Sequence, residues 1–325
     1  MHMFHITNGD CSLHRMRKAG VKGEILPWRD VLHDGPVISD NQLESVSTER
    51  AKFIASAGWG VQEEIQHSLE QRDRMLASAR DYDRIVLWFE LDLYDQLQIL
   101  QLLNWFADQS ETHNKLYLIC HHDYLGSIST EEMASLIGTE QAISTQQLKL
   151  AQRAWQAFTD STPQGLVDLY YADTSALTYL HAAIGRLLAF FPAPGSGLNR
   201  TEHHAISAIA RGMSAADVLF EACQQADGIR FMGDSSFWII LEELSSGEHP
   251  LLLTHKGKAF KRPSSTPYPE DFRAMRLRLT DDGRATLTGD KDSMALRKLD
   301  RWIGGIHLTP NNLWRWDAIR GQMVR

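Results

Sequence analysis

Short apolar runs alternate with polar, helix-favouring stretches through the first 128 residues of the chain. Four runs have the length and composition of buried strands, at residues 4–6, 23–26, 84–89 and 115–119. The stretches between them predict a helix over 12–19, two helices within 42–80 that break near Gly58, and a helix over 95–106. Strands that alternate with helices in this way predict an α/β fold with a Rossmann-like, mostly parallel sheet.

The pattern becomes helical after residue 128. We predict helices over 131–137, 145–158 and 175–190, without a strand signal among them. PAPGSG (192–197) is the clearest linker. Beyond it, N-cap signals at Asn199, Ser214 and Asp234 predict three short helices, and strands are expected over 251–253, 277–279 and 302–308. This order of elements is typical of a winged-helix-like α+β domain.

A chain of 325 residues suits two domains with a connector, and its 43% hydrophobic and 23% charged residues are ordinary for a globular protein. We therefore expect a Rossmann-like domain over 1–128, a helical connector over 129–191 and a winged-helix-like domain over 192–325. A homo-oligomer is also compatible with the sequence.

The N-terminal segment MHMFHITNGD does not have the pattern of a signal peptide, and no apolar run in the sequence reaches the roughly 18 residues that span a bilayer. We expect a cytoplasmic protein with no membrane partner. Cys11, Cys120 and Cys223 are isolated, and this odd number without a CxxC pair supports neither a disulfide framework nor a cysteine zinc site.

The net charge of −8 is unevenly distributed along the chain. From residue 196 onward there are 18 Lys and Arg against 16 Asp and Glu; since the whole chain has 33 and 41, the front has 15 and 25. The front part is therefore not expected to bind a polyanion. The one basic stretch is KGKAFKRPSSTPYPEDFRAMRLR, residues 256–278.

Polar residues follow each predicted strand of the front part. The carboxyl ends of parallel strands meet at one edge of a sheet, where ligands bind, so we expect these residues to share one crevice. The stretch WRDVLHDGP (28–36) is then a loop that lines the crevice. The candidate ligand-binding residues are Asn8, Gly9, Trp28, Arg29, Asp34, Glu90, Asp92 and His121.

These residue types suit the recognition of a phosphate or a sugar. Gly9 lets the backbone approach a phosphate and Arg29 offers a bidentate fork. Asp10, Asp30 and His33 are the candidates for acid–base catalysis, and the carboxylates are also able to hold Mg²⁺. GxGxxG and GxxxxGK[ST] are both absent from the sequence, so neither a standard dinucleotide site nor a P-loop is indicated.

Each candidate also has a structural interpretation. Arg29 forms an ion pair with Asp30 or Asp34 that fastens the loop, and Asp10 caps the helix that follows it. Trp28 and Trp88 are expected to pack in the core rather than stack on a base.

The histidines add little to these alternatives. Neighbours on a strand point to opposite faces, so at most one of His121 and His122 is expected in the site. The set His5, His33 and His121 has no recognised metal-binding spacing.

DNA binding by the rear domain is possible but disfavoured by the charge of its helices. The third predicted helix, in GDSSFWIILEELSSG (233–247), contains no Lys or Arg and carries Glu242 and Glu243. Phosphates would be repelled by that surface. Contact with DNA would have to come from the basic stretch, with Lys256, Lys258, Lys261 and Arg262 as the candidate residues.

The segments HITNGD (5–10), GEILPWRDVLHDGPV (23–37) and VLWFELDLYDQLQILQLL (86–103) together resemble a bacterial family catalogued as domain of unknown function 1835. The rear segments GLNRTEHHAI, FMGD, LTDDGRATLTGDKD and RWIGGIHL resemble its usual C-terminal companion domain. The resemblance covers nearly the whole chain but implies no substrate or catalytic residue, only that 8–10 and 28–36 belong to the signature. Leu91 stands where members of the family often carry His, which weakens an acid–base role for that strand end.

Three functions follow as hypotheses. The leading one is an enzyme that binds a small phosphorylated or nucleotide-like anion, held by Arg29 and the Asn8–Gly9 turn, with Asp10, Asp30 and His33 in acid–base or Mg²⁺ roles. The second is a ligand-sensing regulator whose winged-helix-like domain contacts DNA or a protein. The third is a scaffold without catalysis.

Overall fold

The computed structural model describes residues 2–40, 42–263 and 268–325. The chain is a mixed α/β protein that divides into two compact units. Unit 1 comprises Met1–Gly185 together with Gly304–Ile306, and unit 2 comprises Arg186–Ile303 together with His307–Arg325. The division falls inside helix α8 (Leu180–Leu188). None of the helices among the described residues is long and apolar enough to cross a membrane.

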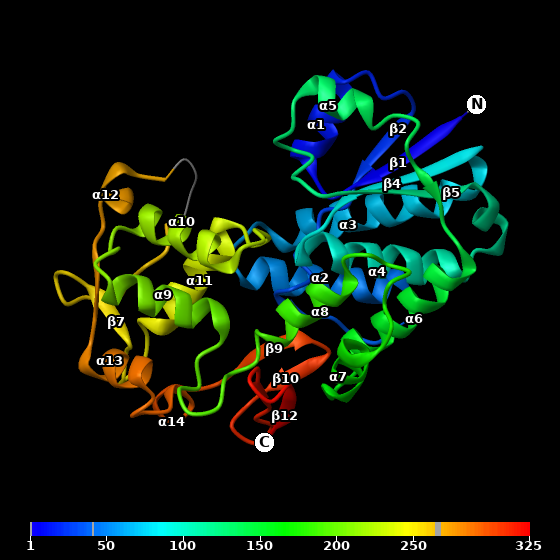
Figure 1. Ribbon diagram of the computed structural model, residues 1–325. Helices are drawn as coiled ribbons and strands as arrows, with labels where there is room; N and C mark the ends of the chain where they lie inside the picture. Colours follow the sequence, from blue (N-terminus) through cyan, green and yellow to red (C-terminus); the bar gives the residue numbers. More distant parts are fainter. Residues whose placement is uncertain (1, 41, 264–267) are drawn as a thin grey trace. The chain divides into compact units, whose positions relative to one another are not determined.

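Unit 1 is built on a five-stranded sheet with the strand order β2-β1-β4-β5-β6 (Figure 1). Four of the strands run parallel, and β6 is antiparallel to β5. The predicted mostly parallel sheet is thereby confirmed. The strands are β1 (Met3–Thr7), β2 (Glu24–Pro27), β4 (Arg84–Glu90), β5 (Leu116–His121) and β6 (Gln141–Ala142), with a separate short strand β3 (Gly35–Pro36).

Helices cover both faces of this sheet. In Figure 1, α1 and α5 lie on one face, while α2, α3, α4 and α6 lie on the other. The helices of unit 1 are α1 (Asp10–Lys18), α2 (Leu43–Ser56), α3 (Gln62–Ala77), α4 (Leu93–Ala107), α5 (Thr130–Ser135), α6 (Thr145–Thr159) and α7 (Gln164–Tyr171), with 3₁₀ helices at Ser78–Asp81 and Ser110–Lys115.

The break predicted within 42–80 is confirmed, because α2 ends before Gly58, where φ is +77°. We predicted no strand within residues 129–191, and this is wrong because β6 lies there. Helix α7 was not predicted.

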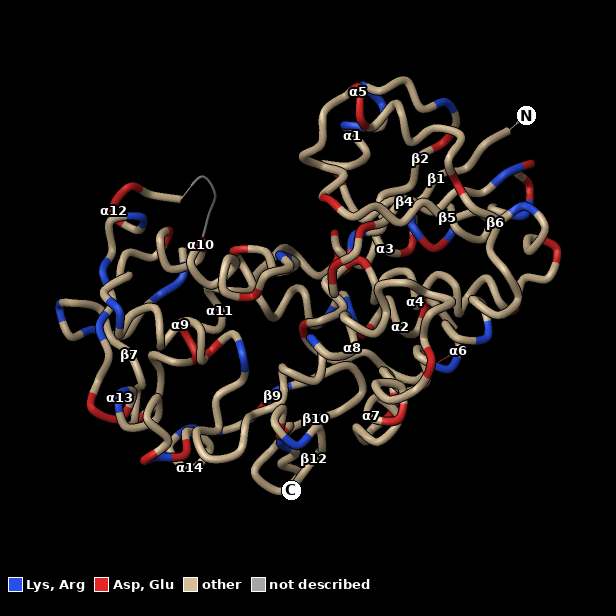
Figure 2. Tube along the Cα trace, in the orientation of Figure 1, with Lys and Arg blue, Asp and Glu red and all other residues tan. Residues whose placement is uncertain are grey.

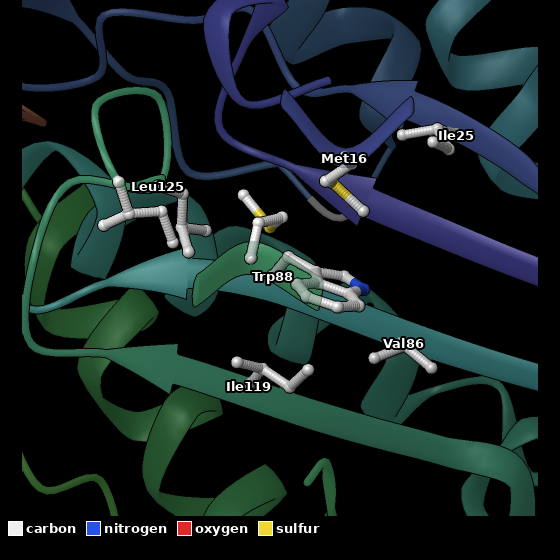
Figure 3. Packing of buried hydrophobic residues seen from close by; sticks show 8 residues of the cluster. Met16, Ile25, Val86, Trp88, Ile119 and Leu125 are labelled. Carbon is white, nitrogen blue, oxygen red and sulfur yellow. The ribbon is translucent and has the colours of Figure 1, made fainter. Parts of the chain in front are cut away.

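Apolar side chains hold α1 and α5 to the sheet. Met16 of α1 packs on Trp88 and Val86 of β4 and on Ile119 of β5, and Leu125 closes the cluster at the carboxyl end of the strands (Figure 3). Every residue of β4 after Arg84 is buried, as expected for a strand covered on both faces.

Unit 2 begins with three helices, α9 (Arg200–Ala210), α10 (Ala216–Asp227) and α11 (Asp234–Leu244). A capping box between Asn199 and Glu202 starts α9, as predicted. The prediction that Ser214 caps α10 is wrong, because Ala215 precedes that helix and no side chain caps it. The remaining elements are β7 (Leu252–Thr254), α12 (Glu270–Arg273), β8 (Leu277–Leu279), α13 (Asp281–Thr288), α14 (Ser293–Leu296), β9 (Arg301–Gly304), β10 (Ile306–Leu308), β11 (Arg315–Asp317) and β12 (Gln322–Val324).

Strands β7 and β8 form an antiparallel pair after the three helices, in the order that the sequence indicates. The single strand predicted over 302–308 is wrong. The chain instead forms β9 and β10, because Gly304 takes a positive φ of +56° and interrupts the extended backbone.

Candidate functional site

The strand order of unit 1 contains a topological switch point. The chain leaves β1 toward β2 on one side and then returns past β1 to form β4 on its other side. The connections from the two neighbours β1 and β4 therefore diverge, and in open sheets of this topology ligands bind outside the carboxyl ends of such strands. The residues that follow these two strands are Asn8 and Gly9 after β1, and Leu91 and Asp92 after β4.

Three buried carboxylates lie at this position. Glu90 is the last residue of β4, Asp92 is the N-cap of α4 and Asp95 belongs to the first turn of α4. They are 3%, 4% and 0% exposed, and one oxygen from each lies within 4.8 Å of the others. Within residues 2–40, 42–263 and 268–325, this carboxylate cluster is the only group of His, Cys, Asp and Glu with a geometry suited to a metal ion.

The side chain of Asn8 is bonded to the carboxylate cluster from β1. Its Nδ2 group donates to Oε1 of Glu90 at 2.8 Å and lies 2.9 and 3.0 Å from the two carboxylate oxygens of Asp95. Oδ1 of Asn8 in turn accepts from the hydroxyl of Ser12 at 2.6 Å. An amide nitrogen thus stands among three carboxylate oxygens, the position that suits a partial or full positive charge.

Backbone N–H groups complete the contacts of the carboxylate cluster. Glu90 accepts from the N–H of Leu125 at 2.7 Å, Asp95 from the N–H of Glu90 at 2.6 Å, and Asp92 from the N–H of Asp95 at 3.0 Å. The cluster therefore has hydrogen-bond donors but no Lys or Arg ion-pair partner among the described residues.

The environment shifts the proton affinity of all three acids upward. Burial raises the pKa of Glu90 to about 7, against the opposing hydrogen bonds from Asn8 and Leu125. Burial also raises the pKa of Asp92 to about 7, and the charge of Glu90 adds to the effect. The pKa of Asp95 is raised well above its ordinary value, by burial first and then by the other two charges. The cluster can therefore exchange protons near neutral pH, and a cation would favour its charged form.

Arg29 and Asp10 meet at the rim of the same edge. The Arg29 guanidinium donates through Nε and Nη2 to the two carboxylate oxygens of Asp10 at 2.8 and 2.6 Å. The predicted partners Asp30 and Asp34 are therefore wrong, although an ion pair does form. The side chains are 53% and 65% exposed, so water screens the pair and leaves Arg29 accessible. The hydrogen bond from Arg29 lowers the pKa of Asp10.

Asp30 lies in a buried ion pair with Arg50 of α2, at 2.8 Å. The same guanidinium donates to the backbone carbonyls of Val31, Asp34 and Pro36, at 2.8, 2.7 and 3.1 Å. Arg50 thus ties most of the loop 28–36 to α2, and the structural partner of Asp30 is identified.

Trp28 and Trp88 pack in the core, as expected. The Trp28 indole is buried, donates to Gln101 at 2.8 Å and lies under the guanidinium of Arg72, 3.9 Å from the ring centre. Trp88 donates its indole N–H to Nδ1 of His5 at 3.0 Å.

Tyr94 connects the loop 28–36 with the carboxylate edge. Its hydroxyl donates to the carbonyl of Asn8 at 3.3 Å, and its ring lies edge-on to His33 at 6.0 Å. His33 is buried, with Nε2 3.7 Å from Asp34. The loop therefore does reach the strand ends, as the sequence indicates.

His121 is the β5 register partner of Glu90, which places it at the same sheet edge. Its Nδ1 accepts from the N–H of Asp123 at 3.1 Å. The expected opposite orientation of His121 and His122 is wrong, because their rings are 4.4 Å apart. Asn8, Asp10, Arg29, Glu90, Asp92 and His121 are thus assembled along one edge.

The basic stretch of unit 2 is partly paired with acidic residues. Lys261 and Arg262 lie 3.7 and 3.2 Å from the carboxylate of Glu242 in α11, whereas Lys256 and Lys258 are exposed. Figure 2 shows Lys and Arg interspersed with Asp and Glu through unit 2. DNA binding by this stretch stays a prediction.

No protein-family model matches the chain, and no curated protein matches it either. The site accordingly rests on its geometry. Sequence reasoning gave no separate role to Asp95 and did not foresee the amide of Asn8 among the acids. The sequence did offer a signal for the cluster. Glu90 follows a predicted strand, and Asp92 and Asp95 begin the helix after it, so their side chains are held near the same turn.

Proposed function

We propose that unit 1 is the catalytic unit of an enzyme that acts on a small phosphorylated or nucleotide-like molecule, with a divalent cation such as Mg²⁺ held by Glu90, Asp92 and Asp95. The observation that carries this proposal is the position of the buried carboxylate cluster at the switch point between β1 and β4. Buried acids without a basic partner destabilise a fold, so their presence here supports a function that needs them.

The ligand follows from the chemistry of the same edge. Mg²⁺ in proteins is bound by one or two carboxylates together with phosphate oxygens of the substrate. Gly9 precedes α1, and a Cβ added there meets no atom within 4 Å, which leaves room for a phosphate at the helix N-terminus. Arg29 at the rim is able to exchange Asp10 for that phosphate, since the pair is exposed.

In this proposal Asp10 and Asp30 have no acid–base role, because Asp10 is bonded to Arg29 and Asp30 to Arg50. Glu90 serves as a cation ligand, and a bound cation would displace the proton that burial otherwise favours on its side chain.

For unit 2 we propose the winged-helix-like arrangement that the sequence indicates. Its support is the order of three helices followed by the antiparallel β7–β8 pair, with an additional bridge between Ala215 and Arg276. Membership of the family catalogued as domain of unknown function 1835, and a regulatory role for this unit, are further proposals.

Cation binding is tested by thermal unfolding of the full chain at about pH 8 in EDTA, MgCl₂ or MnCl₂, each with and without a nucleotide. A cation at about 100 times its dissociation constant stabilises the fold by about 2.7 kcal/mol. Asp92→Asn removes a proposed ligand, while Asp108→Asn changes an exposed acid at the other end of α4 and serves as the control.

We expect the cation to stabilise the wild type and Asp108→Asn equally. Asp92→Asn should bind the cation at least tenfold more weakly, which lowers the stabilisation at the same cation concentration by about 1.4 kcal/mol. Equal responses of all three proteins, or none, would contradict the cation site. A cation response without any effect of nucleotides would retain the site and reject the proposed substrate class.

A further inference from the structure

A cavity of about 460 Å³ lies within unit 2. Two segments distant in sequence form its walls, one after the acidic face of α11 and one between α14 and β9. Its volume is in the range of small-molecule sites, roughly 300–1,000 Å³. The lining residues are Glu243, Ser246, Gly247, Glu248, His249, Met294 and the segment 296–301.

Two lining arginines share one carboxylate. Arg297 and Arg301 both donate to Oε1 of Glu202, at 3.2 and 2.8 Å. Glu202 is fully buried, and its other oxygen accepts the N–H of Asn199. Arg301 has a second carboxylate at 2.9 Å, from Glu243, but that side chain is 47% exposed and its charge is screened by water. The two arginines thus face two carboxylates, of which only Glu202 is buried.

Donors of both guanidinium groups are left over. Nε of Arg297 and Nη1 of Arg301 are buried and have no acceptor among the residues that the structure describes. The neighbouring Lys298 is exposed in the same wall and has no carboxylate within ion-pair distance in the described part of the chain. Unpaired guanidinium and ammonium donors are best satisfied by a carboxylate or a phosphate.

The acidic residues of the cavity do not all oppose an anion. Glu243 is engaged by Arg301, and Asp300 accepts from Nε2 of His307 at 2.7 Å. Glu248 has no basic partner in the described residues, and Asp300 keeps its negative charge beside His307, so both of these acids would repel an anionic ligand. We propose that this cavity binds a small molecule through its carboxylate or phosphate group, with Lys298, Arg297 and Arg301 as the recognising side chains.

Isothermal titration of the full chain with inorganic phosphate and, separately, with citrate tests the site and distinguishes the two anions. Sodium chloride at matched ionic strength controls for unspecific screening. Lys298→Ala removes an exposed recognising charge, Lys256→Ala removes an exposed lysine outside the cavity, and Glu248→Gln removes one opposing charge.

We expect saturable binding of at least one anion, about tenfold weaker in Lys298→Ala, unchanged in Lys256→Ala and tighter in Glu248→Gln. Absence of saturable binding by both anions overturns the proposal. Equal affinities of wild type and Lys298→Ala overturn it as well. Binding that Lys256→Ala weakens as much as Lys298→Ala would show a diffuse charge effect and not this cavity.

Discussion

Glu90→Gln is the substitution that most directly tests the strain carried by the carboxylate cluster. Glu90 has an ordinary pKa of 4.5 in an unfolded chain, and burial raises this to about 7 in the folded one. One pKa unit corresponds to about 1.4 kcal/mol, so the ionised side chain costs the folded state about 3 kcal/mol at alkaline pH. Glutamine keeps an oxygen to accept from Asn8 and Leu125 but removes the charge.

The sign of the pH dependence follows from the raised pKa. The folded state binds the Glu90 proton more tightly than the unfolded state, so the stabilising effect of that proton is complete below about pH 4.5 and is lost as the pH rises through about 7. Without divalent cations and at about pH 8, the free energy of unfolding of Glu90→Gln should therefore exceed that of the wild type by about 3 kcal/mol, and the variant should unfold at a higher urea concentration. The difference should disappear near pH 4.5.

Urea denaturation in EDTA, followed by repetition in MgCl₂, measures both the strain and its relief. Magnesium should stabilise the wild type and leave Glu90→Gln unaffected. The difference in free energy of unfolding between the two proteins should therefore become smaller or change sign. Glu64→Gln, at an exposed site in α3, is the matched control and should follow the wild type throughout. A Glu90→Gln protein that is less stable than the wild type by the same amount at every pH would refute the reasoning.

Three further substitutions test three ion pairs of the protein by urea denaturation. Arg50→Met leaves the buried Asp30 with only the more distant guanidinium of Arg72, at 4.0 Å, and should cost about 3–5 kcal/mol; a loss below about 1 kcal/mol would contradict the anchoring role. Arg29→Ala breaks an exposed pair and should cost less than about 1 kcal/mol while abolishing the nucleotide response, and unfolding would instead show a structural role. Burial opposes ionisation of Glu202, but the charges of Arg297 and Arg301 outweigh burial and lower its pKa to about 2. The free energy of unfolding should therefore fall as the pH drops from about 4.5 to about 2. Glu202→Gln should lose this pH dependence, and an acid transition identical to that of the wild type would contradict the argument.

The parallel sheet was predictable because its strands are buried on both faces. A strand such as β4 is apolar from Ile85 to Phe89 because both of its faces are buried, and this makes it visible in the sequence. The two-residue strands β3 and β6 carry no such pattern, since Gln141 and Ala142 are exposed and are fixed only by pairing with β5. The interruption at Gly304, by contrast, had a local signal in the pair Gly304–Gly305, which the prediction of a single strand did not use.

The location of the site was predictable, but the partners of its charged groups were not. Parallel strands direct their carboxyl ends to one edge, so Asn8, Glu90 and His121 had to come close together. Which acid Arg29 would bind depends on side-chain reach across two loops, and the sequence favours Asp30 and Asp34 because they are much nearer to Arg29 along the chain than Asp10 is. The decision comes from Arg50, which occupies Asp30 from α2 and leaves Asp10 to Arg29.

The buried acids of this protein fall into two classes, and the contrast supports the functional proposal. Asp30 and Glu202 are buried with guanidinium partners, Arg50 for the first and two arginines for the second, so each charge is compensated inside the fold. Burial with such partners fastens a loop or a helix end and requires no ligand. The carboxylate cluster has only amide and backbone donors, and its protons are held more tightly as a result. The absence of an arginine beside these acids, at the switch point between β1 and β4, supports the proposal that a cation from outside binds there.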